Sequence, residues 1–238
     1  MTTRAMVVGA SSGIGEALSR KLAAEGYEVG LTARTVDRLR DIADELPTGT
    51  YIAEMDIRDV DAARETFFDL AEAMGTVDVI VLNAGIAPGN VDLEWEPERD
   101  TIDTNVRGFT ALAVAAMNYF EGQGHGQLVG TSSVAAYVGS SSIPAYYASK
   151  AFVSNYLEGL RYKTDYLDAD ITVTTVEPGF VDTELADGSF WRCSPETAAA
   201  LMATAIRNKK SHQYVTRRWH LVALLLTLLP RRVKERLL

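Results

Sequence analysis

The sequence VVGASSGIG, residues 7–15, places three glycines at the corner between an apolar run and a helical pattern. Glycine lets the backbone turn sharply and approach a pyrophosphate closely, and the N-terminus of the following helix offers unpaired N–H groups. A glycine-rich turn also occurs without a ligand, but a position between the first strand and the first helix favours a dinucleotide site. The candidate cofactor contacts in this turn are Gly9, Ser11, Ser12, Gly13, Ile14 and Gly15.

Outward from this turn, short apolar runs alternate with amphipathic stretches along the whole chain. Strands are predicted at Arg4–Gly9, Tyr27–Ala33, Tyr51–Asp56, Val77–Leu82, Gln127–Thr131, Ile171–Glu177 and, shorter, Gln213–Val215. Helices are predicted at 13–25, 36–46, 60–74, 98–121, 145–168 and 195–208. Continuous apolar strands are typical of a parallel sheet covered on both faces. We therefore expect an α/β fold, a single doubly wound domain with a mostly parallel seven-stranded sheet and helices on both faces.

The composition narrows the class of protein. The 238 residues are 47% hydrophobic and 23% charged, which is typical of a globular domain and excludes disordered and disulfide-scaffold classes. One cysteine and three histidines leave little for a metal site, so none is predicted. A formal charge of −9 argues against a nucleic-acid partner. No basic-then-apolar leader precedes the glycine turn, and we expect a cytoplasmic protein.

The C-terminal residues 217–238 differ from the catalytic domain predicted at 1–216. Residues 211–238 hold six basic residues and one acidic residue, so they carry +5 while the rest of the chain carries −14. The apolar run Leu221–Leu229 is too short to span a bilayer. Peripheral membrane contact, packing on another subunit and a cover over the active-site mouth all remain open. Separately, the helix around Thr110–Met117 is apolar on nearly every side, which favours a homo-oligomer, a dimer or a tetramer.

The end of the second strand bears on the choice of nicotinamide cofactor. An acidic residue there binds the ribose 2′-hydroxyl of NAD(H), whereas an arginine suits the 2′-phosphate of NADP(H). In this chain Ala33 takes the place of the acid and Arg34 follows it. We therefore expect NADP(H) to be preferred, with NAD(H) as the alternative.

A group suited to proton transfer follows the fifth predicted strand. Tyr146 and Lys150 are four residues apart, which places both on one face of a helix. Ser133 lies at the carboxyl end of the strand, the edge at which open parallel sheets bind ligands. A phenol has a pKa of about 10, and a lysine placed beside it can lower that pKa toward neutrality. The bare spacing is weak, but the neighbouring serine favours a catalytic site.

Several further motifs stand in a consistent order along the chain. They are Asp56 after the third strand, NAG at Asn83–Gly85, Asn105 in TNVRG, and PGFVDT at Pro178–Thr183. With the glycine turn and the Ser133, Tyr146 and Lys150 group, they make nearly the whole chain resemble the short-chain dehydrogenase/reductase family. That resemblance implies a Rossmann-like NAD(P)-dependent oxidoreductase that acts on CH–OH or carbonyl groups.

The resemblance also implies roles for single residues. Tyr146 would transfer the proton, Ser133 would hold the substrate oxygen, Lys150 would lower the phenol pKa and grip the nicotinamide ribose, and Asn105 would hold a relay water. The cofactor would further be contacted by Asp56, Ile57, Asn83, Ala84, Gly85, Pro178, Gly179, Val181 and Thr183. The chain departs from the family pattern at Val8, Leu82 and Glu177. These positions would support the cofactor site, and the predicted catalytic residues are all present.

The substrate side is less defined by sequence. Stretches near Ile86–Trp95, Val134–Ile143 and Leu185–Pro195 are candidate pocket walls, and their apolar residues suit a hydrophobic ketone or aldehyde and the corresponding alcohol. Phe190 and Trp191 fit a mobile flap and a loop anchor equally well. An NAD-linked alcohol dehydrogenase and a non-catalytic nucleotide sensor or scaffold are the alternative functions. The substrate, the physiological direction and the subunit number do not follow from the sequence.

Overall fold

A computed structural model describes residues 2–183, 190–228 and 230. Its strands are β1 (Arg4–Val8), β2 (Glu28–Ala33), β3 (Thr50–Glu54), β4 (Val79–Leu82), β5 (His125–Thr131), β6 (Asp170–Pro178) and β7 (His212–Val215). They form one seven-stranded sheet in the order β3-β2-β1-β4-β5-β6-β7, and every pair is parallel. The predicted α/β fold is confirmed.

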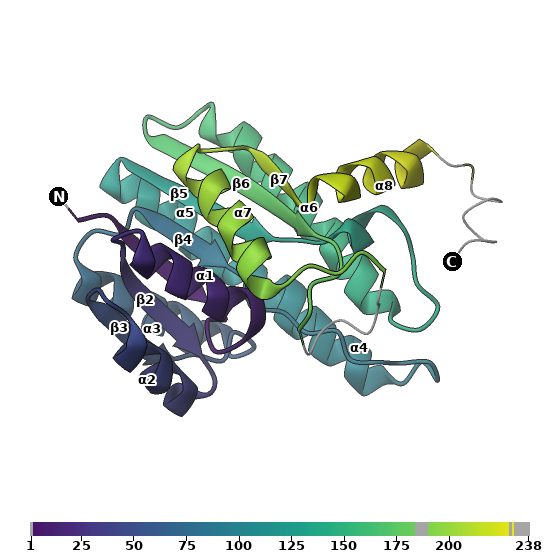
Figure 1. Ribbon diagram of the computed structural model, residues 1–238, viewed down its shortest axis with the longest axis horizontal. Helices are drawn as coiled ribbons and strands as arrows, with labels where there is room; N and C mark the ends of the chain where they lie inside the picture. Colours follow the sequence, from purple (N-terminus) through teal and green to yellow (C-terminus); the bar gives the residue numbers. More distant parts are fainter. Residues whose placement is uncertain (1, 184–189, 229, 231–238) are drawn as a thin grey trace.

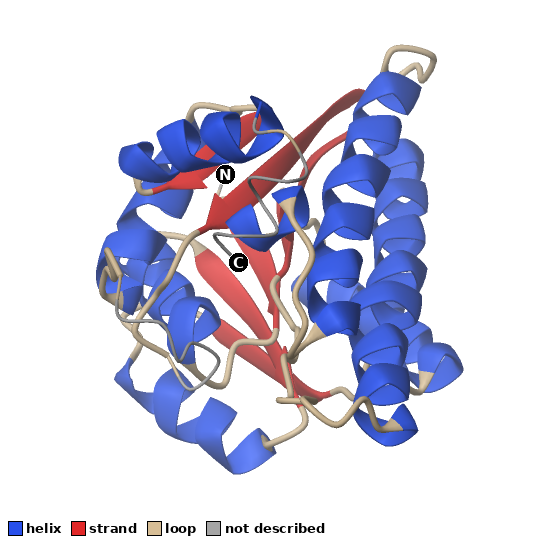
Figure 2. Cartoon of the chain, turned by 90° about the vertical axis from the view of Figure 1, so that its right-hand side faces the viewer, coloured by secondary structure: helices blue, strands red, loops and turns tan. Residues whose placement is uncertain are grey.

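Helices connect the strands and cover both faces of the sheet (Figures 1 and 2). They are α1 (Gly13–Ala24), α2 (Val36–Glu45), α3 (Val60–Met74), α4 (Trp95–Ile102), α5 (Phe109–Gln123), α6 (Pro144–Thr164), α7 (Pro195–Arg207) and α8 (Arg217–Leu228). Two short segments complete the set, the π-helical η1 (Asp103–Gly108) and the 3-10 helix η2 (Val134–Tyr137).

The helix predicted over 98–121 corresponds to an unbroken helical stretch that contains one π-type turn. In the structure that stretch begins at Trp95 and passes from α4 through the wide turn η1 into α5. Gly108 ends η1 against the carbonyl of Ile57, and a Cβ at position 108 would overlap that carbonyl. A single π-type turn inside an α-helix is rare and is frequently found at a functional site. Here it carries Asn105, whose contacts are described below.

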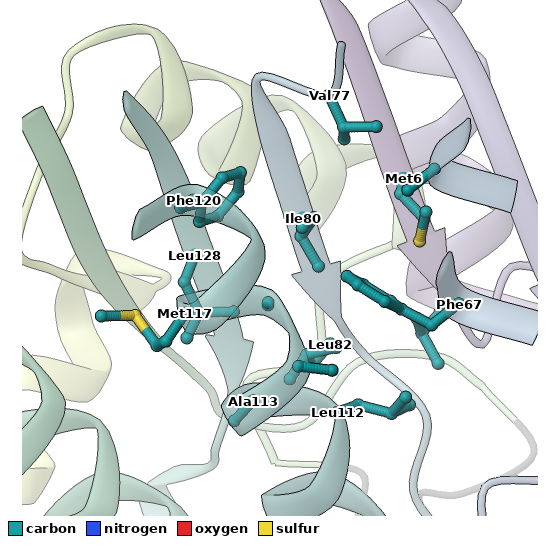
Figure 3. Packing of buried hydrophobic residues seen from close by; sticks show 14 of the residues in the cluster. Met6, Phe67, Val77, Ile80, Leu82, Leu112, Ala113, Met117, Phe120 and Leu128 are labelled. Atoms are coloured by element: carbon teal, nitrogen blue, oxygen red, sulfur yellow. The ribbon is translucent and has the colours of Figure 1, made fainter. Parts of the chain in front are cut away.

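Two apolar cores lie on opposite faces of the sheet because successive residues of a strand point to opposite sides. Met6 and Val8 of β1 face a core built with α3, α5 and α6, whereas Ala5 and Val7 face a core built with α1, α2 and α7. Figure 3 shows the first core, in which Phe67, Phe120 and Leu128 fill the space between helices and sheet. Strands buried on both faces explain the continuous apolar runs of the sequence.

The strand order reverses between β1 and β4, which places a switch point at the carboxyl edge of the sheet. Connections leave β1 and β4 there in opposite directions, and the crevice between them is where open α/β sheets bind ligands. Apart from Asn105 on η1, the predicted site residues lie at or after the carboxyl end of a strand, or on the helix that follows it.

Candidate active site

The glycine turn at the end of β1 is shaped by close contacts that only glycine permits. Gly9 has φ of +84°, and a Cβ there would lie 2.7 Å from the backbone of Ala84. A Cβ at Gly15 would overlap the carbonyl of Gly9. The Asn83 amide donates a hydrogen bond of 3.2 Å to that same carbonyl. The turn is therefore braced against the start of the segment that follows β4.

The first turn of α1 keeps its amide groups available. Ser12 is the N-cap residue, its side chain makes no capping hydrogen bond, and the residue is exposed. Gly13 has φ of +56°, and a Cβ there would lie 3.0 Å from a methyl carbon of Thr183. The loop after β6 thus lies directly against the glycine turn, as a site shared by both would require.

Arg34 and Asp56 lie near each other after β2 and β3. Arg34 is exposed and makes no hydrogen bond or ion pair with any residue that the structure describes. Asp56 is held by Arg58, whose guanidinium approaches it to 2.6 Å, and this hydrogen bonding lowers the Asp56 pKa, with a smaller contribution from Arg34. The arginine predicted to bind a 2′-phosphate is therefore free to do so.

The segment after β4 joins the two halves of the carboxyl edge. Thr131, at the end of β5, donates a hydrogen bond of 3.2 Å to Asn83. A Cβ at Gly85 would lie 3.2 Å from Oδ1 of Asn105 and 3.5 Å from Nζ of Lys150. Gly85 therefore allows the backbone to pass beside two of the predicted catalytic residues.

Ser133, Tyr146 and Lys150 converge in the structure as predicted. The Ser133 hydroxyl is buried, donates to the Pro178 carbonyl at 3.3 Å and is close enough to Tyr146 to affect its titration by hydrogen bonding. Nζ of Lys150 lies 5.7 Å from the centroid of the Tyr146 ring. Since α6 begins at Pro144, its first two turns carry both residues toward Ser133.

Burial is the largest influence on the pKa of Tyr146 in this arrangement. Burial raises the pKa of the phenol, and the hydrogen bond with Ser133 opposes this rise only in part. Lys150 is itself desolvated, which lowers its pKa to about 8. Its ammonium donates to the carbonyl of Thr131 at 3.0 Å and lies over the ring of Tyr146. The phenol is consequently protonated at neutral pH, which suits a proton donor.

The side chain of Asn105 bridges the segment after β4 and α6. Its carbonyl accepts from the Ile86 amide at 2.9 Å, and its amide donates to the Ile86 carbonyl at 2.8 Å and to Ser149 at 3.1 Å. Both amide protons are used, so the side chain retains only acceptor capacity for a water. Asn105 thus fixes the backbone after β4 against α6.

The loop from Pro178 to Thr183 approaches the site, but Gly179 has a packing role that the sequence analysis missed. A Cβ at Gly179 would overlap the indole of Trp219, which is buried at the start of α8. Trp219 also meets the ring of Phe180 edge to face at 5.6 Å. In the sequence, Trp219 stands out in a basic, leucine-rich tail, but only the tertiary structure shows that it packs against Gly179, forty residues earlier.

Phe190 and Trp191 pack on the same tryptophan. They stack on each other at 4.5 Å, and both meet Trp219 edge to face. Arg218 lies over the Trp191 ring at 5.3 Å and donates to the Trp191 carbonyl. This supports the loop-anchor interpretation for these two residues. Residues 185–189 of the predicted flap at 185–195 lie outside the described residues.

A buried polar network stands behind the catalytic group. The carboxylate of Glu177 is 1% exposed and accepts from Tyr137 and from Ser154, each at 2.7 Å. It also lies 3.2 Å from Nε2 of His212. Tyr137 ends η2, four residues after Ser133, and Ser154 lies one helical turn after Lys150. Glu177, counted in the sequence only as a departure from the family pattern, thus joins η2, which follows Ser133, to α6, which carries Tyr146 and Lys150.

Comparison with known proteins agrees with this geometry. The family model described as short chain dehydrogenase matches residues 3–191. An uncharacterized oxidoreductase of Myxococcus xanthus is 37% identical over 187 residues, 76% of this chain and 73% of the relative. An NADP-dependent 3-hydroxy acid dehydrogenase of Shigella flexneri is 33% identical over 183 residues, 74% of this chain and 71% of the relative.

Solved structures share the fold. An alcohol dehydrogenase of Thermococcus sibiricus, complexed with 5-hydroxy-NADP, has a TM-score of 0.80 at 24% identity, covering 90% of this chain and 96% of that one. A dehydrogenase/reductase of Burkholderia phymatum in complex with NAD has a TM-score of 0.86 at 20% identity, covering 94% and 92%. With the family model matched over most of its length, this chain belongs to the short-chain dehydrogenase family of oxidoreductases.

Proposed function

We propose that this protein is an NADP(H)-dependent oxidoreductase that interconverts a hydrophobic ketone or aldehyde and its alcohol, with Tyr146 as the proton donor and acceptor. The observation that carries the proposal is the convergence of Ser133, Tyr146 and Lys150 beside the glycine turn at the switch point of the sheet. Such a crevice is the usual ligand site of a doubly wound fold.

The residues at the turn fit a dinucleotide. The amides at the start of α1 lack a side-chain cap, so they are available to phosphate oxygens. Because a side chain at position 9 would overlap Ala84, only glycine fits there and the turn presents its backbone to a ligand. Arg34, exposed and without a partner among the described residues, supplies a planar guanidinium that matches a phosphate. Strand β2 ends at Ala33, where an NAD(H)-binding protein would have an acidic residue, and this favours NADP(H) over NAD(H).

When bound, the nicotinamide supplies or accepts the hydride. Tyr146 donates its proton to the carbonyl oxygen in reduction, and as the phenolate it removes the hydroxyl proton in oxidation. Ser133 would turn its hydroxyl from the Pro178 carbonyl to donate a hydrogen bond to that oxygen. Lys150, whose pKa of about 8 leaves it mostly charged at neutral pH, stabilises the phenolate that reduction leaves behind. Asn105 acts as a positioning residue through its bonds to Ile86 and Ser149.

Aromatic side chains near the loop after β6 favour an apolar substrate. Phe190 and Trp191 are 56% and 41% exposed, so their stacked rings offer apolar surface beside Phe180. The Shigella flexneri relative is named for 3-hydroxy acids, and such a substrate would need a cation for its carboxylate. Both substrate classes therefore belong in the test.

The test follows absorbance of the reduced nicotinamide at about 340 nm, with NADPH and NADH in separate reactions. The substrates are a series of hydrophobic ketones and aldehydes and, in the reverse direction, their alcohols together with 3-hydroxy acids. Turnover of apolar carbonyls with NADPH is the expected result. Turnover only of 3-hydroxy acids would overturn the substrate class while leaving the reaction type, and turnover with NADH alone would overturn the cofactor preference.

Binding without turnover is the outcome that would replace the proposal. A non-catalytic sensor would bind NADPH, detected by its fluorescence, and would reduce none of the compounds. The same result for Tyr146→Phe and for the natural sequence would identify that case.

A further inference from the structure

Helix α8 is apolar on two opposite faces. Trp219 and Ala223, four residues apart, are buried against the body of the protein. Leu221, Leu224, Leu225 and Leu228 follow the i, i+3, i+4, i+7 spacing of a single helix face and are 68%, 51%, 56% and 72% exposed. We call these four residues the leucine stripe. Figure 1 shows α8 at the margin of the molecule, extending away from the sheet beyond β7.

The inner face fixes the orientation of the helix. The indole of Trp219 fills the space left by Gly179 and is surrounded by the rings of Phe180, Phe190 and Trp191. Arg218 adds two hydrogen bonds to the backbone of residues 191 and 192. Because the first turn is held by these contacts, the leucine stripe is held facing outward.

The charge around the stripe is basic in an otherwise acidic protein. Arg217, seven residues before Leu224, lies on the same helix face, is exposed and has no hydrogen-bond or ion-pair partner among the described residues. After the helix the sequence continues with Arg231, Arg232, Lys234 and Arg236, and only Glu235 opposes them. Basic residues thus precede and follow the leucines, although residues 1–210 carry −14.

We infer that the leucine stripe of α8 is a docking surface for a bilayer that contains anionic phospholipids. An interfacial helix inserts an apolar face to the depth of the acyl boundary and pairs flanking cations with headgroup phosphates. No helix among the described residues is long and apolar enough to cross a membrane, so the contact is peripheral.

Charge favours a membrane over a second copy of the chain. Two copies paired through this stripe would bring two basic segments of +5 together, which costs repulsion, whereas an anionic surface attracts each of them. The inference does not rest on the proposed reaction.

The test is co-sedimentation of the full chain with vesicles of phosphatidylcholine, alone or mixed with phosphatidylglycerol. The protein is expected to pellet with the mixed vesicles and to be released by high salt. Replacing the leucine stripe (Leu221→Gln, Leu224→Gln, Leu225→Gln, Leu228→Gln) should lower the apparent partition coefficient roughly tenfold or more. The matched control is Phe68→Gln with Tyr166→Gln, two exposed rings outside α8, which should pellet like the natural sequence.

A second variant isolates the charge. Arg231→Gln, Arg232→Gln, Lys234→Gln and Arg236→Gln keep the stripe and should reduce binding to the mixed vesicles at low salt. Circular dichroism and a thermal midpoint confirm that each variant is folded. Equal pelleting of the natural sequence and the stripe variant would overturn the inference. The inference would also be overturned if the natural sequence did not pellet and the stripe variant eluted as a smaller particle than the natural sequence in gel filtration. That result would identify a contact between subunits.

Discussion

The ammonium of Lys150 lies over the Tyr146 ring, 5.7 Å from its centroid, and donates to the Thr131 carbonyl at the end of β5. The hydrogen bond holds the lysine to the sheet, and burial rather than an ion pair sets its pKa at about 8. The Lys150 ammonium, which deprotonates near pH 8, thus lies next to the Tyr146 phenol, whose pKa is raised. This relationship gives the first two predictions.

Tyr146→Phe should lower turnover by at least about 10²-fold, because it removes a positioned acid and base, while NADPH binding persists. The matched control is Tyr147→Phe on the same helix, whose ring meets that of Tyr146 edge to face. Steady-state rates and NADPH fluorescence titration measure the two effects. Comparable losses in both variants would contradict a specific role for Tyr146.

Lys150→Met should be more stable than the natural sequence at about pH 7, and this advantage should shrink as pH rises. The folded pKa is about 8 against an ordinary 10.5, so between those values the unfolded chain binds a proton that the folded chain has released. Stability of the natural sequence therefore rises with pH across that window, by about 3 kcal/mol for this group at 1.36 kcal/mol per unit.

Urea unfolding of both proteins at about pH 7 and about pH 10 measures this difference, and comparing the two cancels the titration of tyrosines and Cys193. The variant should be inactive at either pH. A stability difference that does not change with pH would rule out a lowered pKa for Lys150.

Arg34→Asp should shift the ratio of kcat/KM values from NADPH toward NADH, because a carboxylate repels the 2′-phosphate and accepts from a 2′-hydroxyl. Arg64→Asp, an exposed arginine on α3, controls for the change in net charge. An unaltered ratio in Arg34→Asp would remove the basis for the cofactor preference.

Glu177→Ala should destabilise the protein by about 1–3 kcal/mol, since the hydroxyls of Tyr137 and Ser154 lose their buried acceptor. In a double-mutant cycle with Tyr137→Phe, urea unfolding should give a coupling of about 0.5–3 kcal/mol. Ser141→Ala, at an exposed position after η2 with no side-chain hydrogen bond to a described residue, should change stability by less than about 0.5 kcal/mol. Additive effects of Glu177→Ala and Tyr137→Phe would show that the 2.7 Å contact contributes nothing.

Phe152→Glu should reduce the size of the assembly if the expected homo-oligomer forms through α5 and α6. Phe152 and Val114 are 37% and 38% exposed on these helices, and a shallow apolar depression of about 440 Å³ lies nearby, lined by Ile102, Val106 and Ala148 among others. A carboxylate placed in such an interface would be desolvated without a partner. Sedimentation velocity measures the effect, with Phe68→Glu on α3 as the control. An unchanged sedimentation coefficient would place the interface elsewhere.

Much of the fold and of the candidate site followed from local sequence. The glycine turn and the four-residue spacing of Tyr146 and Lys150 depend on contacts within a few residues, so the sequence pattern was sufficient to predict them. The predicted strands mostly agreed with the observed strands to within one or two residues. The helix over 98–121 was predicted, but its π-type turn was not, and Gly108 at the end of that turn packs against Ile57, a residue about fifty positions away.

The sequence by itself determined the parallel sheet, the glycine turn and the placement of Tyr146 and Lys150 on one helix face, because period, glycine placement and residue spacing are local properties. Only the tertiary structure decided that burial lowers the Lys150 pKa, that Glu177 joins η2 to α6, and that Gly179 is required by Trp219. Desolvation and packing are set by residues distant in the chain, and no local pattern records which of them will meet.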